Sequence, residues 1–161
     1  MLVLYMFKPK GINLLIQAGK WVIKTLKIMI EGEKYIVIVN NYFTFLFAEF
    51  NFKISKETVN GNFFYDVQFK NEYKAISISY ENIENYLRVV IYILENGQLP
   101  HYNNLTKILP LNQINKILLP KIEKKEHILN DDYFSNFTPI GELERQLLKS
   151  AKELRLCLKY F

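Results

Sequence analysis

The chain has 161 residues, of which 50% are apolar and 15% aromatic, and its formal net charge at pH 7 is +5. A chain of this length usually forms one domain, and this apolar content excludes an intrinsically disordered protein. The single cysteine, Cys157, excludes an intramolecular disulfide and a cysteine-rich zinc site. Because Cys157 lies among leucines, we expect its thiol to be buried and unreactive.

The positive charge is concentrated near the N-terminus. Residues 1–34 contain six of the 21 basic residues and two of the 16 acidic residues, so the rest of the chain is nearly neutral. We therefore divide the chain into a basic amphipathic N-terminal segment, residues 1–30, and a single α+β domain, residues 31–161. A further hypothesis is that Met6 or Met29 is the true start, which would leave the upstream residues out of the native protein.

Residues 12–30 have the pattern of a basic amphipathic helix. Lys20, Lys24 and Lys27 recur at helical spacing, and apolar side chains such as Ile16 fall largely on the other side. Such a helix can lie on an anionic membrane, so membrane-surface attachment through this segment is one hypothesis. The apolar runs are too short for a membrane span, and a signal peptide fits poorly because no cleavage site follows.

The next region allows two interpretations. As a helix, residues 33–50 place apolar side chains at spacings of three and four. As strands, residues 27–31 and 34–39 would form a hairpin, which the β-branched residues of the second run favour. We prefer the helix because its apolar stripe continues without a break through Phe50.

Residues 52–94 have the pattern of four consecutive strands. The dipeptide Asn60-Gly61 separates the first two, and both residues tolerate the positive φ of a tight hairpin turn. Short connections predict that neighbouring strands pair antiparallel, as a meander. The expected strands are 52–59, 63–69, 73–80 and 86–94.

The last two strands differ in their patterns. In the third, Ile76 and Ile78 alternate with serines, which predicts that the isoleucines point into the core and the serines point outward. Residues 87–94 are almost continuously apolar. We therefore expect the fourth strand to be central and covered on both faces.

The rest of the chain is expected to be helical around one long connection. Proline residues bracket a short helix at 112–119, and the charged, Asn-rich residues 121–137 read as a surface connection. Thr138 is the expected N-cap of the last helix. The fold class is therefore α+β: a four-stranded antiparallel meander at about 52–94, with flanking helices at about 33–50, 112–119 and 139–160.

One group of residues has the types found in metal-dependent nucleases. Asp66 lies on a strand, and Glu72 and Lys74 stand at the start of the next. In such enzymes, carboxylates hold Mg²⁺ and a lysine helps to activate water. The alternative is an ordinary polar hairpin tip, which we prefer because only a short turn separates the residues.

Other sites of chemistry have weaker support. A metal site using His101, His127, Asp131 and Asp132 is one hypothesis, but the histidines lack a paired ligand spacing. The glycines form neither a dinucleotide fingerprint nor a phosphate loop. We therefore expect no cofactor, no metal and no enzymatic activity.

Aromatic side chains are frequent in the predicted sheet, and they allow a nucleic-acid hypothesis. Exposed aromatic rings stack on bases in single-strand binders. Alternation along the strands predicts that about half of these rings are core, and Arg88 is the only arginine before residue 145. Nucleic-acid binding therefore stays an alternative, and exposed tyrosines suit protein recognition better.

The stretch from Tyr42 to Leu94 resembles small uncharacterised bacterial α+β proteins, some of which are like immunity proteins of toxin systems. The resemblance rests on hydrophobic pattern. The residues that match it are Phe69, Asn71, Glu72, Ile76, Ile78, Ser79 and Tyr80. It identifies no functional residue. It implies a cytoplasmic, non-enzymatic protein that binds another protein, such as an immunity protein or inhibitor that neutralises a toxin.

Overall fold

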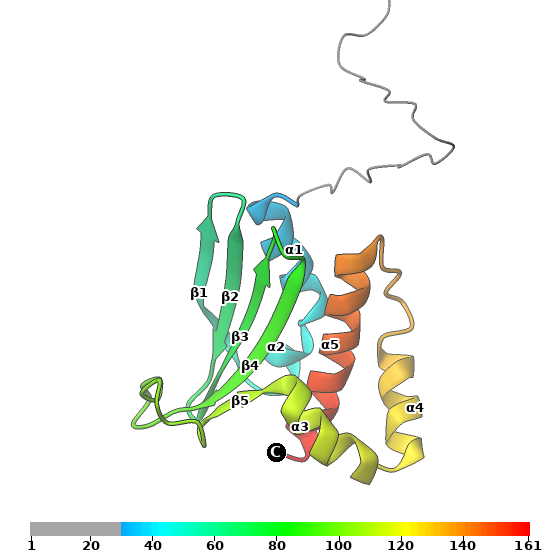
Figure 1. Ribbon diagram of the computed structural model, residues 1–161. Helices are drawn as coiled ribbons and strands as arrows, with labels where there is room; N and C mark the ends of the chain where they lie inside the picture. The colour runs from blue at the N-terminus through cyan, green and yellow to red at the C-terminus, as the bar shows by residue number, and fades with distance from the viewer. Residues whose placement is uncertain (1–29) are drawn as a thin grey trace, which may run out of the picture.

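The computed structural model describes residues 30–161, which form a sheet with helices on one face (Figure 1). The expectations for residues 1–29, including membrane attachment and the alternative starts at Met6 and Met29, lie outside the described residues. Within residues 30–161, no helix is both long and apolar enough to cross a membrane.

The sheet has five antiparallel strands in sequential order, so the predicted meander is confirmed with one additional strand. The fifth strand was missed because it is only three residues long and ends at a proline, which gives no alternating pattern. The strands are β1 Lys53–Asn60, β2 Phe64–Lys70, β3 Lys74–Glu81, β4 Tyr86–Ile93 and β5 Ile108–Pro110.

The hairpin predicted from Asn60-Gly61 forms between β1 and β2. Gly61 has a φ of 50°, and the Phe63 N–H donates to the Asn60 carbonyl at 3.1 Å. Three residues rather than two therefore connect the strands, and glycine supplies the left-handed conformation that the turn needs.

The helices differ from the predicted boundaries. The expected helix over 33–50 is interrupted at Phe43 and Thr44, and residues 121–137, expected to be a connection, contain a helix of their own. The hairpin alternative for residues 34–39 is wrong because these residues are helical. The helices are α1 Gly32–Tyr42, α2 Phe45–Ala48, α3 Leu111–Leu118, the 3₁₀ helix η1 Leu119–Lys121, α4 Lys124–Tyr133 and α5 Glu142–Lys159.

The last helix starts later than expected, so Thr138 is not its N-cap. Gly141 precedes α5 with a φ of 91°, a conformation that interrupts the helical path. Glu144 accepts a hydrogen bond from the Ile140 N–H at 2.8 Å, which satisfies a donor at the helix start.

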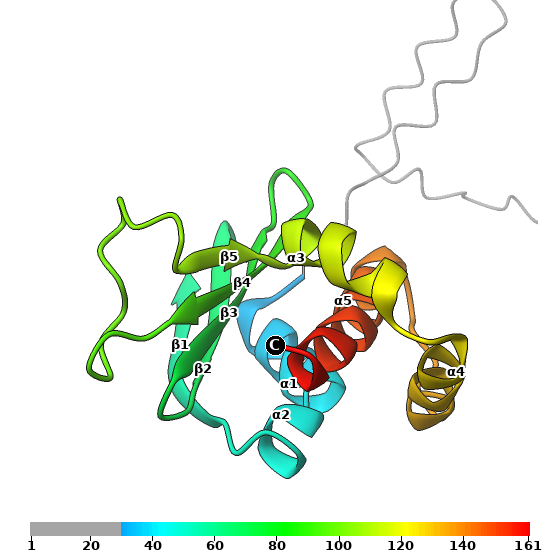
Figure 2. The ribbon, with the colours of Figure 1, turned by 90° about the horizontal axis from the view of Figure 1, so that it is seen from below.

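The core lies between the sheet and the helices α1 and α5 (Figure 2). Ile76 and Ile78 point into it as predicted, and both are fully buried. Tyr35 of α1 is buried against the sheet and donates from its hydroxyl to the Ile78 carbonyl at 2.9 Å. We call the sheet face that turns away from these helices the outer face.

The fourth strand, β4, is an inner strand between β3 and β5, although the middle strand of the five is β3. The middle of the apolar run of β4 is buried on both faces, as predicted, at Val89, Val90 and Ile91, whereas Tyr86 and Arg88 are exposed. The edge strand β1 carries a register shift between Ile54 and Lys56, a feature that discourages pairing with another chain.

Candidate functional site

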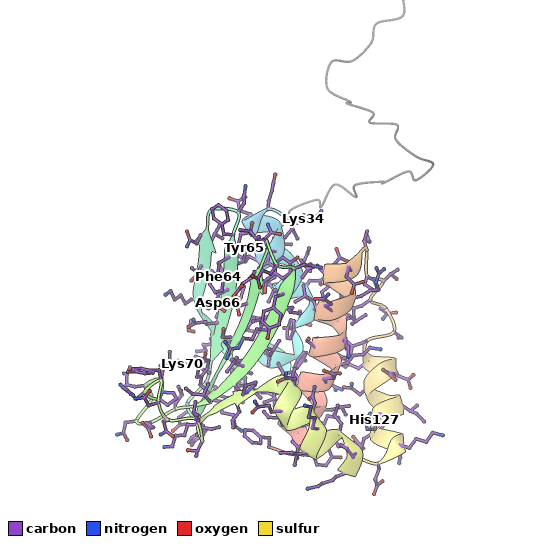
Figure 3. The ribbon with its side chains drawn as sticks, viewed as in Figure 1. Lys34, Phe64, Tyr65, Asp66, Lys70 and His127 are labelled. Atoms are coloured by element: carbon purple, nitrogen blue, oxygen red, sulfur yellow. The ribbon has the colours of Figure 1, made fainter. Side chains whose placement is uncertain are left out.

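The predicted nuclease residues are not brought together. Asp66 is only 5% exposed on the outer face of β2, where it accepts hydrogen bonds from Ser77 Oγ at 2.6 Å and from Gln68 Nε2 at 2.7 Å (Figure 3). Glu72 lies in the β2–β3 turn, beyond the end of β2 at Lys70, whereas Asp66 lies within the strand. The Asp66 carboxylate therefore accepts from two neutral side chains, and Glu72 does not lie beside it as a second metal ligand would.

Lys74 takes part in a different contact. Its Nζ donates to the Phe161 carbonyl at 2.7 Å and lies 5.0 Å from the centre of the Phe161 ring. This side chain anchors the C-terminal residue against the start of β3, away from Asp66 on the outer face.

The two histidines lie on opposite sides of the molecule. His101 belongs to the connection between β4 and β5, and His127 lies on α4, as the position of its label in Figure 3 shows. Asp131 forms an ion pair with Lys152 at 2.8 Å. Among residues 30–161, no group of three or more His, Cys, Asp or Glu side chains could hold a metal ion.

The aromatic side chains of the sheet are divided between core and surface. Tyr65, Phe69 and Tyr80 are buried in the core, as alternation requires. Phe63 and Tyr86 are exposed, but they stand at the ends of strands. The outer face therefore lacks a row of exposed rings of the kind that single-strand binders use.

The longest connection of the sheet has the features of a binding surface. Residues 94–107, the β4–β5 loop, join β4 to β5 and project beyond the sheet (Figures 1 and 2). Tyr102 and Leu105 are each 75% exposed, and Leu99 is 52% exposed. Loops of this length are uncommon in compact domains, where they are usually either functional or disordered.

The β4–β5 loop is held together by its own polar contacts. Glu95 Oε1 accepts from Lys107 Nζ at 2.6 Å and from Asn104 Nδ2 at 3.3 Å, so one carboxylate joins the two ends of the loop. Thr106 Oγ1 donates to Asn104 Oδ1 at 2.8 Å, and the Asn104 N–H donates to the His101 carbonyl at 2.8 Å. These contacts connect the two ends of the loop and the residues near its tip.

A hollow of about 480 Å³ lies between the base of this loop and the β2–β3 turn, with Tyr73 and Leu94 in its wall. The Leu94 N–H donates to the Tyr73 carbonyl at 2.8 Å, which ties the turn to the loop. Asn71 Oδ1 accepts from the N–H groups of Tyr73 and Lys74, so the turn is fixed as well. A hydrogen bond to Glu72 raises the pKa of Tyr73, whose ring is 67% exposed.

We call the four exposed side chains Tyr73, Leu99, Tyr102 and Leu105 the loop surface. The predicted site residues did not include them. The sequence carried a signal for the loop in its Asn-rich composition and in the large apolar residues at positions 99, 102 and 105.

Comparisons of this chain with family models, with curated proteins and with solved structures found no match.

Proposed function

We propose that the protein is a non-enzymatic domain that binds another protein through the loop surface, and that it acts in the cytoplasm as an immunity protein or inhibitor that neutralises a toxin. The observation that carries this proposal is an ordered 14-residue loop that presents Leu99, Tyr102 and Leu105 to solvent.

The physical basis is a balance between contact area and lost freedom. Tyrosine and leucine side chains remove a large apolar area from water when a partner covers them. A loop that Glu95 already closes on itself loses less conformational entropy on binding than a mobile one. The grouping of three exposed large apolar side chains, Leu99, Tyr102 and Leu105, in one loop supports recognition as their purpose.

The direct test captures partners from native cells with tagged full-length protein and with the variant Tyr102→Ser/Leu105→Ser. The variant Ile117→Ser/Ile128→Ser is the matched control, since both isoleucines are also exposed but lie on α3 and α4. We expect the loop variant to capture at least tenfold less partner than the wild type, because each side chain can contribute about 1 kcal/mol or more. The control variant should capture as much as the wild type.

The immunity role has its own readout. A gene next to the one for this chain should encode a toxin, and co-expression should restore growth. Loss of protection in the loop variant but not in the control supports the proposal. Equal protection by both variants, or a steep salt-dependent gel shift with nucleic acid in place of a protein partner, would refute it.

A further inference from the structure

A second hollow lies at the other end of the sheet from the loop surface. It encloses about 630 Å³ between the start of α1, the β3–β4 turn and the start of α5. Figure 3 shows Lys34, one of its lining residues, at this end of the molecule. We call this feature the upper hollow.

The floor of the upper hollow is apolar. Tyr80 is buried there, and Ile38 and Leu143 are partly buried and pack against the core. Ile140 also lines the hollow and is 82% exposed, the most exposed large apolar side chain among residues 30–161. An apolar group bound in this hollow would therefore cover the Ile140 side chain and remove its apolar surface from water.

The rim of the upper hollow is acidic. Three carboxylates line it, those of Glu31, Glu142 and Glu144, and Lys34 is the one cation among the lining residues; Arg145, outside the lining, pairs with Glu142 at 3.1 Å, so the rim keeps a net negative charge. Hydrogen bonds from Gln146 and Arg145 lower the pKa of Glu142, so this carboxylate is fully ionised at neutral pH. By contrast, residues 30–161 contain 16 basic and 16 acidic residues, because five of the 21 basic residues lie before residue 30, so the described part of the chain is neutral as a whole.

We propose that the upper hollow binds a lysine-rich apolar segment of a partner protein. Apolar side chains of that segment fill the floor beside Ile140, and its ammonium groups meet the carboxylates of Glu31 and Glu142 at the rim. The negative rim favours a cationic occupant, and the apolar floor disfavours a polycation that has no apolar side chains. This site lies apart from the loop surface, so the proposal stands independently of the proposed function.

The probe is a synthetic peptide of alternating leucine and lysine blocks that forms an amphipathic helix, with a leucine–glutamate peptide as its charge-reversed counterpart. Fluorescence anisotropy with the full-length protein should show saturable binding of the lysine peptide only. Charge reversal in the variant Glu31→Lys/Glu142→Lys should weaken binding about tenfold at low salt, and much less at 0.5 M salt. The variant Glu57→Lys/Glu123→Lys changes the same net charge at exposed sites outside the hollow and should bind as the wild type does.

The neutral variant Glu31→Gln/Glu142→Gln guards against unfolding, because circular dichroism can verify its helices and it should still lose affinity about threefold. Ile140→Ser should weaken binding a similar amount through the lost apolar contact. Equal effects of the hollow and control variants would overturn the proposal, as would no binding by the wild type. Binding that appears only after Lys20, Lys24 and Lys27 are changed to glutamate would also overturn it, and would assign the hollow to this chain's own N-terminal segment.

Discussion

Arg155 of α5 is a cation in the interior of the helical layer, and its removal should be strongly destabilising. The residue is 8% exposed. Its Nε donates to Glu49 Oε1 at 2.8 Å, its Nη1 donates to Asn130 Oδ1 at 2.9 Å, and its guanidinium lies 3.9 Å from the centre of the Tyr133 ring. One side chain thus connects α5 to α4 and to the end of α2.

The magnitude for Arg155→Met follows from these contacts. Two charge-assisted hydrogen bonds contribute about 1.5 kcal/mol each, and the cation–π contact adds about 0.5 to 1 kcal/mol. Glu49 keeps some access to water and methionine regains part of the packing, so we expect a net loss of about 3 kcal/mol. For a domain of this size, that lowers the melting temperature by about 10 °C.

Urea and thermal unfolding followed by circular dichroism measure this loss, with Arg145→Met as the control. Arg145 is an exposed arginine of the same helix that pairs with Glu142, so its replacement should cost less than about 0.5 kcal/mol. A double-mutant cycle of Arg155→Met with Asn130→Ala should give a coupling of about 1 kcal/mol. Similar stabilities for the two methionine variants, or a coupling near zero, would refute the reasoning.

Three further predictions concern single residues. Gly32→Ala should destabilise by about 1 to 3 kcal/mol, because a Cβ there would stand 2.5 Å from Val59 Cγ1, and adding Val59→Ala should restore most of the loss in urea unfolding. Burial raises the pKa of the Cys157 thiol to about 11, so the folded protein should resist iodoacetamide at pH 8 and react only in denaturant; rapid labelling of the native state would contradict this. Burial and a hydrogen bond to Glu144 raise the pKa of Tyr42 to about 12. The neutral phenol is therefore favoured in the fold, and its contribution is fully present below pH 10 and declines as the pH rises from 10 to 12, a decline that Tyr42→Phe should reduce.

The sequence predicted those parts of the fold in which local chemistry and tertiary packing agree. Gly61 adopts the positive φ that the turn needs, and the alternation of Ile76 and Ile78 with serines matched a sheet whose helices cover one face. Both signals are local, and the sheet that forms satisfies them without conflict.

The parts that were missed depend on tertiary contacts. The three residues of β5 become a strand only because β4 offers them an edge. Helix α4 is mostly polar, so its sequence has little apolar periodicity, and it is held by contacts such as that of Asn130 Nδ2 with the Lys152 carbonyl. From the sequence, Arg155 would be expected at the surface; its burial depends on contacts with Asn130 and Glu49, which lie far away in the chain.

The candidate site was predicted less well than the fold. The residue types of Asp66, Glu72 and Lys74 suggested a metal site. The pairing of β2 with β3 places their side chains along different parts of the sheet. The loop surface depends on exposure and on the closing contacts of Glu95, and neither is readable from the order of residues alone.

Amide hydrogen exchange on the complex with the captured partner would locate the contact surface. Our proposal predicts slowed exchange in residues 94–107 and in the β2–β3 turn around Tyr73, with little change along β1. Protection confined to the outer face of the sheet or to α4, with no effect on the β4–β5 loop, would contradict the proposal that this protein recognises its partner through that loop.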